Sequence, residues 1–157
     1  MNATPPDAAT VRLPPPLVVL ATIAAGVLLQ HLFPLRVALP TGARIAASGA
    51  LGAIAVALGV GAMRHFRRTG QNPAPWTSTP EIIATGVYRR TRNPMYVSMA
   101  LFQASLAIGA ANGWLLLLVP LLVLVIQATA IRHEEAYLER KFGDAYRAYK
   151  RRVRRWI

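Results

Sequence analysis

Four long stretches of this chain contain no Asp, Glu, Lys or Arg, and each approaches the length that crosses a lipid bilayer. They are residues 17–33, 45–63, 94–111 and 113–131. A spanning helix needs about 20 apolar residues, because the hydrocarbon core offers no partner to an unpaired backbone N–H or C=O. The sequence therefore predicts an all-α membrane protein with about four transmembrane helices.

The composition supports that fold class. Hydrophobic residues make up 54% of the 157 residues and charged residues 15%. Soluble domains have about 45–50% apolar residues and about 25% charged residues. Cysteine is absent from the sequence, which excludes disulfides, thiolate metal ligands and a cysteine nucleophile. No metal site is expected.

Basic residues are distributed unevenly between the two sides of the predicted bundle. Of the 18 Lys and Arg, six lie in residues 64–92 and nine in residues 132–155, and Arg12 precedes the first apolar segment. Cytoplasmic loops carry an excess of Lys and Arg, so both termini and the 64–92 loop are expected in the cytoplasm. Orientation and attraction to anionic lipids then account for the net charge of +12, and no nucleic-acid partner is predicted.

Three parts are expected along the chain. Residues 1–16 are rich in Pro and Ala and are predicted to form a disordered N-terminal arm. Residues 17–63 would form two transmembrane helices, and residues 64–157 a core of a loop, a transmembrane hairpin and a C-terminal helix. In the second helix a stripe of small residues favours close packing within one chain or between chains, so an oligomer is compatible with the sequence. The stripe consists of Gly49, Ala53, Ala57 and Gly61.

The turn Ala111-Asn112-Gly113 is too short to separate the helices it joins, so the last two apolar segments must be antiparallel neighbours. The start of one and the end of the other then meet at the cytoplasmic face. This geometry places Arg92 beside Glu134 and Glu135.

Beyond Glu135 the chain is predicted to form an amphipathic helix that lies on the headgroups or caps the bundle, with a kink at Gly143. Its apolar positions recur at steps of three or four: Leu138, Phe142, Ala145, Tyr149, Val153 and Trp156.

Charged side chains at a membrane boundary need partners, so Arg92 and the two glutamates have a purely structural interpretation as ion pairs. Adjacent residues on a helix point about 100° apart, so Glu134 and Glu135 cannot both face one arginine. The Asn93-Pro94 pair also begins a helix, whose free N–H groups favour an anion. A small zwitterion would satisfy all of these groups, with Tyr88 or Tyr96 facing a cation. The methionine part of S-adenosylmethionine is such a zwitterion.

Two segments resemble a known group of enzymes. "GVYRRTRNPMYVS" (86–98) and "EEAYLERKFGDAYRAYKRRVRRW" (134–156) are similar to the isoprenylcysteine carboxyl methyltransferases and phospholipid methyltransferases, which are integral-membrane proteins. The resemblance covers about residues 70–157. It implies an S-adenosylmethionine site at the cytoplasmic ends of the last two helices, and Arg92, Glu134 and Glu135 as catalytic residues. The cofactor-binding residues that it implies are Tyr88, Arg92, Asn93, Pro94, Tyr96, Glu134 and Glu135.

Two positions depart from that family's pattern. Asn93 stands where the carboxyl methyltransferases usually have His, which favours the phospholipid-methyltransferase-like and bacterial branches and removes the obvious general base. Ser98 stands where Gly is usual, and its hydroxyl could crowd the cofactor or a neighbouring helix.

We therefore expect an S-adenosylmethionine-dependent methyltransferase of the bacterial inner membrane, with its active site facing the cytoplasm. Its acceptor would be lipophilic: an isoprenylcysteine carboxylate, a phospholipid amine or a small hydrophobic molecule. An amine would need a base, for which Glu134 or Glu135 is nearest, and the loop 71–85 and the C-terminal helix would act as lids. The alternative is a non-enzymatic scaffold or a transporter-like protein. Transport is disfavoured because no apolar segment carries a charge at mid-membrane.

Overall fold

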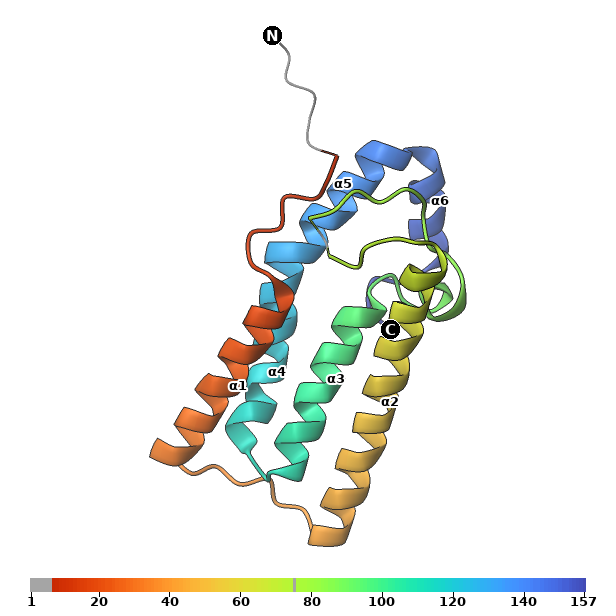
Figure 1. Ribbon diagram of the computed structural model, residues 1–157. Helices are drawn as coiled ribbons and strands as arrows, with labels where there is room; N and C mark the ends of the chain where they lie inside the picture. Colours follow the sequence, from red (N-terminus) through yellow and green to blue (C-terminus); the bar gives the residue numbers. More distant parts are fainter. Residues whose placement is uncertain (1–6, 75) are drawn as a thin grey trace.

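Four antiparallel helices form the body of the protein in a computed structural model that describes residues 7–74 and 76–157. They are α1 (Pro15–Leu32), α2 (Thr41–Arg68), α3 (Pro94–Gly109) and α4 (Gly113–Ile126). Helix α2 packs on α3, α3 on α4, and α4 on α1 (Figure 1). The remaining elements gather at one end of this bundle: η1 (Gly86–Arg89), η2 (Gln127–Ile131), α5 (Arg132–Phe142) and α6 (Asp144–Arg152).

The body has the proportions of a membrane protein. Three helical runs among the described residues are long and apolar enough to cross a bilayer: Pro15–Leu32, Thr41–Arg68 and Gly113–Phe142. Helix α3 is also apolar but has only 16 residues. Large apolar side chains point outward from these helices, among them Leu20 (61% exposed) and Leu117 (61% exposed). Lipid tails match such a surface, so the predicted all-α membrane fold is confirmed.

Small residues do bring α2 against α3, but from a different stripe than the spacing predicted. Gly49 has open space around it, and Ala53 and Ala57 are exposed. The face against α3 carries Gly52, Ala55, Gly59 and Ala62 instead. Small residues occur all round α2, so spacing alone could not select the face. The contacts of two α3 serines, Ser98 and Ser105, determine which face of α2 packs on α3.

Ser98 and Ser105 use the room that the glycines of α2 leave. A Cβ on Gly59 would lie 2.8 Å from Ser98 Oγ, and one on Gly52 would lie 3.0 Å from Ser105 Oγ. Ser98 Oγ donates to the carbonyl of Ala55 at 2.8 Å. The hydroxyl that stands where glycine is usual is therefore accommodated by Gly59 and bonded across the interface.

The hairpin between α3 and α4 is held by Asn112. Its Oδ1 accepts from the N–H of Leu115 at 2.8 Å, which caps α4, and its Nδ2 donates to the carbonyl of Gly26 in α1 at 3.1 Å. The tight antiparallel connection is as predicted. It returns the end of α4 to the end of the bundle where α3 begins (Figure 1).

The C-terminal segment caps this end of the bundle. Helix α5 continues from α4 through the wide turn of η2, and it stops at Gly143, whose φ of +52° breaks the helix where a kink was predicted. After the break Tyr146, Tyr149 and Val153 form a buried cluster. Their partly buried neighbours are Leu138, Phe142, Ile82 and Ala84. Ala145, predicted on the apolar face, is exposed, because the break resets the helical register.

The segment that precedes α1 in the chain lies alongside η2 and α5. Residues 1–6 lie outside the described residues, so the disordered arm stays a prediction there. From Asp7 onward the chain makes contacts: Ala9 is only 4% exposed, and the N–H of Arg12 donates to the carbonyl of Thr129 at 3.2 Å.

Gly86 offers a test of how η1 is held against α2. Its φ is +57°, and an added Cβ would overlap the imidazole of His65, whereas Gly70 has φ +66° with nothing within 4 Å. We expect Gly70→Ala to lower the free energy of unfolding by about 1–2 kcal/mol through backbone strain alone. Gly86→Ala should cost about 1–3 kcal/mol more through the overlap. Denaturation in detergent measures both, and equal losses would show that His65 does not confine this turn.

Candidate active site

A pocket opens at the end of the bundle, between the loop that follows α2, the start of α3, and helices α5 and α6. Its empty space, including the mouth, is about 860 Å³. All seven residues predicted to bind a cofactor line it: Tyr88, Arg92, Asn93, Pro94, Tyr96, Glu134 and Glu135. Several residues of the loop predicted to be a lid also line it, among them Gln71, Thr79 and Glu81.

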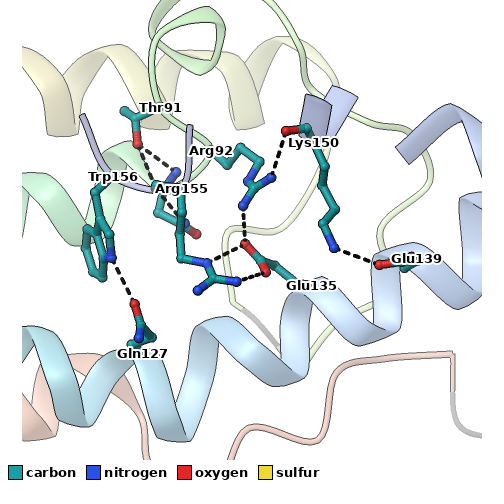
Figure 2. Close-up of polar contacts among 9 residues, drawn as sticks. Thr91, Arg92, Gln127, Glu135, Glu139, Lys150, Arg155 and Trp156 are labelled. Carbon is teal, nitrogen blue, oxygen red and sulfur yellow. Dashed lines mark hydrogen bonds and ion pairs between the residues drawn. The ribbon is translucent and has the colours of Figure 1, made fainter. Parts of the chain in front are cut away.

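Glu135 lies between two arginines. Arg92 Nη2 donates to Glu135 Oε1 at 2.9 Å, and Arg155 binds the same carboxylate through both oxygens, from Nε at 3.0 Å and Nη2 at 2.6 Å (Figure 2). The side chains of Arg92 and Glu135 are each 9% exposed. The hairpin therefore does bring the arginine at the start of α3 against the glutamate beyond α4.

Glu134 faces a different partner. Its Oε1 accepts a short hydrogen bond from the hydroxyl of Tyr96. Among residues 7–74 and 76–157, no hydrogen-bond donor is found for the other oxygen, Oε2. The two adjacent glutamates thus divide as the helix geometry required: Glu135 neutralises the arginines, and Glu134 presents a carboxylate to the pocket.

Asn93 has a structural task. Its Nδ2 donates to the carbonyl of Arg155 at 2.9 Å, and the hydroxyl of Thr91 donates to the same carbonyl at 3.1 Å. The N–H of Arg92 donates to the carbonyl of Arg154 at 2.9 Å, and Trp156 Nε1 donates to Gln127 Oε1 at 3.0 Å. These bonds fold the C-terminal tail across the start of α3.

The tail also supplies a residue that the sequence did not indicate. Arg155 belongs to a basic run expected to contact headgroups, and no local pattern singles it out from its neighbours. The tail's course becomes apparent only in the folded chain.

Tyrosine is concentrated at this site. All five tyrosines of the chain line the pocket: Tyr88, Tyr96, Tyr137, Tyr146 and Tyr149. Burial raises the pKa of Tyr88 and of Tyr146 above the usual value for a phenol, and raises that of Tyr149 to about 12. These phenols stay protonated at neutral pH, and Tyr149 donates to the carbonyl of Tyr88 at 2.7 Å. The walls are therefore neutral aromatic rings around a few charges.

Comparison with known proteins identifies the family. The pattern of the phospholipid methyltransferase family matches residues 43–145, which contain the loop, the hairpin and most of the pocket. The chain belongs to the phospholipid methyltransferase family. It is also 44% identical over 63 residues to an uncharacterized protein of Haemophilus influenzae, a match that covers 40% of this chain and 100% of that protein. No solved structure matches the chain significantly.

The chain belongs to a methyltransferase family, and the groups in its pocket suit a methyl donor that carries both a positive and a negative charge. Arg92 lines the pocket, and its Nε is buried with no hydrogen-bond partner among the described residues. Its guanidinium places a positive charge at the pocket wall, which would attract a carboxylate. Glu134 offers the opposite charge, and aromatic faces suit a sulfonium or an adenine ring. The residues present therefore fit S-adenosylmethionine.

Removal of Glu135 should test how far the ion pairs hold this site together. Glu135→Ala leaves the buried Arg92 without its carboxylate, so we expect the free energy of unfolding to fall by about 3–5 kcal/mol. The matched control is Asp144→Ala, because Asp144 is a 95% exposed partner of Arg147 and should cost less than about 1 kcal/mol. Denaturant titration in detergent compares the two, and similar small losses would show that the pair with Arg92 contributes little.

Proposed function

We propose that the protein is a methyltransferase that uses S-adenosylmethionine to methylate a lipophilic acceptor. The observation that carries this proposal is the pocket, in which Arg92, Glu134 and all five tyrosines of a methyltransferase-family chain converge.

The three charged residues have different roles in cofactor binding in this proposal. Arg92 attracts the cofactor carboxylate by its charge, while its Nη2 and Nη1 atoms donate to Glu135 and to the carbonyl of Lys150. Glu134 binds the cofactor ammonium, and its bond from Tyr96 orients it. Glu135 fixes Arg92. The cofactor supplies a methyl group already activated by the sulfonium, so the protein's contribution is to orient the two reactants and exclude water.

Proton handling depends on the acceptor. A carboxylate, such as that of an isoprenylcysteine, attacks without losing a proton. The amine of a phospholipid must lose one, and of the two adjacent glutamates Glu134 is the one that is not held between arginines. Glu134 is therefore the general base for an amine acceptor.

An apolar groove between α2 and α3 supports a lipophilic acceptor. Its lining is Gly59, Val60, Met63, Met95, Ser98 and Met99. Met95 lines both this groove and the pocket, so the two are neighbours. Methionine side chains are flexible and adapt to irregular alkyl chains. The acceptor chain would lie in this groove while its reactive head reaches the pocket.

The orientation in the membrane follows from charge. The pocket lies at the end of the bundle that carries 15 of the 18 Lys and Arg, which occur in residues 64–92 and 132–155. The positive-inside rule places that end in the cytoplasm, where S-adenosylmethionine is made available, and we propose the bacterial inner membrane as the location.

Cofactor binding is the first test. Calorimetry with purified protein should show S-adenosylmethionine binding, and Glu134→Gln should weaken it about 10-fold or more through loss of a charged hydrogen bond. The control is Glu139→Gln on the same helix, because Glu139 pairs with Arg147 and Lys150 away from the pocket. Labelled methyl groups should then pass from cofactor to an extractable lipid or lipidated product of host membranes. Absence of binding by the wild-type protein would reject the proposal.

Obstruction of the groove tests the acceptor route separately. Val60→Trp places a large ring in the groove, so we expect methyl transfer to a long-chain acceptor to fall about 10-fold or more with cofactor affinity unchanged. Val56→Trp is the control, because Val56 is 58% exposed on the same helix but does not line the groove, and Val60 is 43% exposed. Equal activities of the two variants would exclude this route.

A further inference from the structure

The segment before α1 is fastened to the rim of the pocket by one aspartate. We call residues 7–14 the N-terminal strap. Asp7 Oδ1 accepts from Lys141 Nζ at 2.6 Å, and Oδ2 accepts from the hydroxyl of Ser78 at 2.6 Å. The hydroxyl of Tyr137 lies 3.1 Å from Asp7 Oδ1 and 3.2 Å from the Asp7 carbonyl oxygen. One carboxylate thus joins the strap to the loop after α2 and to α5.

The three attached segments are parts of the pocket wall. Ala9 of the strap, Thr79 of the loop and Tyr137 of α5 all line the pocket. Thr79 is itself tied to α5, because its N–H donates to the hydroxyl of Tyr137 at 3.1 Å. Lys141 Nζ also donates to Ser78 Oγ at 3.0 Å, so the ammonium is shared between loop and strap. We call Asp7, Ser78, Tyr137 and Lys141 the clasp.

The loop that the clasp holds contains no helix or strand in its described residues, 69–74 and 76–85. It crosses from the end of α2 to α5 and returns to η1 (Figure 1). At Ser78 and Thr79, the hydrogen bonds that join the loop to α5 among the described residues involve Tyr137 and Lys141. Loss of these bonds would free that part of the loop from α5 and leave its attachment to α6 through Ile82 and Ala84 intact.

The clasp is also exposed enough to open. The side chain of Asp7 is 64% exposed and that of Lys141 26% exposed, in contrast to the buried pair of Arg92 and Glu135. The hydrogen bond from Lys141 lowers the pKa of Asp7 to about 2, so the carboxylate is ionised at neutral pH. Exposed ion pairs are individually weak, which suits a contact that must form and break during each turnover.

We infer that Asp7 is a positioning residue that closes the cofactor pocket: through the clasp it holds the strap and the loop over the site and sets the rate at which cofactor and product leave. This inference rests on the proposed function. The methyl donor is charged and water-soluble, so it must enter from the end of the bundle where the strap and loop lie. A closed clasp would keep water from the reacting groups and slow release.

Release kinetics test the inference. The measurement uses labelled S-adenosylhomocysteine, the demethylated product. We expect Asp7→Ala to release it about 3- to 10-fold faster than the wild-type protein does, because the variant lacks two or three exposed hydrogen bonds. Lys141→Ala should act similarly, and the double variant should add little because both act on one clasp. Asp144→Ala is the matched control, since Asp144 pairs only with Arg147 among the described residues. Asp7→Asn serves if the alanine variant does not fold.

A cross-link tests the opposite change, because it holds the strap and the loop together permanently. The chain has no cysteine, so Asp7→Cys with Ser78→Cys introduces the only two thiols. A short bis-methanethiosulfonate should join them, slow both uptake and release of the ligand about 10-fold or more, and be reversed by dithiothreitol.

The outcomes separate the two proposals. If the wild-type protein binds ligand and Asp7→Ala releases it no faster than Asp144→Ala does, the clasp does not gate the site and the proposed function stands. Unchanged exchange in the cross-linked protein would likewise reject the gate. If the wild-type protein binds neither S-adenosylmethionine nor its product, the proposed function fails and the inference fails with it.

Discussion

The contact on which this end of the molecule depends is the carboxylate of Glu135 between Arg92 and Arg155. It joins three segments that are distant in sequence: the start of α3, the first turn of α5 and the C-terminal tail. A buried charge pair is costly to desolvate, so its net contribution to stability is smaller than its short distances suggest. Its geometric effect is large, however, because a carboxylate that receives three charged hydrogen bonds has little freedom to move.

Fixing Glu135 also determines what its neighbour does. Successive helix residues point in different directions, so the carboxylate that pairs with the arginines leaves Glu134 turned toward Tyr96 and the pocket. One glutamate of the pair thus serves the fold and the other remains for a ligand. The structural interpretation of these charges holds for Glu135, and Glu134 is the member of the pair that we propose to bind a ligand. A site that separates orientation from binding in this way can retain its shape when the ligand leaves.

The sequence was sufficient for contacts that a local rule controls. A turn of a few residues forces antiparallel helices, and this predicted that Arg92 meets Glu135. The family resemblance, and not the turn, named the seven residues that line one pocket. The sequence was insufficient where several packing arrangements satisfy the same rule. Small residues occur all round α2, so the packing face needed Ser98 and Ser105 of another helix to define it. The amphipathic pattern after Glu135 was extended through Gly143, although a break there restarts the register and exposes Ala145. Arg155 was missed because the path of the tail is a tertiary property.

The proposed reaction joins a water-soluble donor to a lipid-soluble acceptor, and the fold separates their routes. The strap and loop cover the pocket at the polar end of the bundle, whereas the groove of Val60 and the methionines runs between α2 and α3 on the apolar body. Met95 lines both spaces, so the two proposed routes meet at this residue. Opening the clasp for the donor therefore does not require α2 and α3 to part, and the lipid-facing seam held by their serines and glycines can stay closed to water. In this proposal the weak contact of Asp7 controls exchange of the cofactor on the aqueous side, and the close packing of α2 and α3 keeps water out on the lipid side.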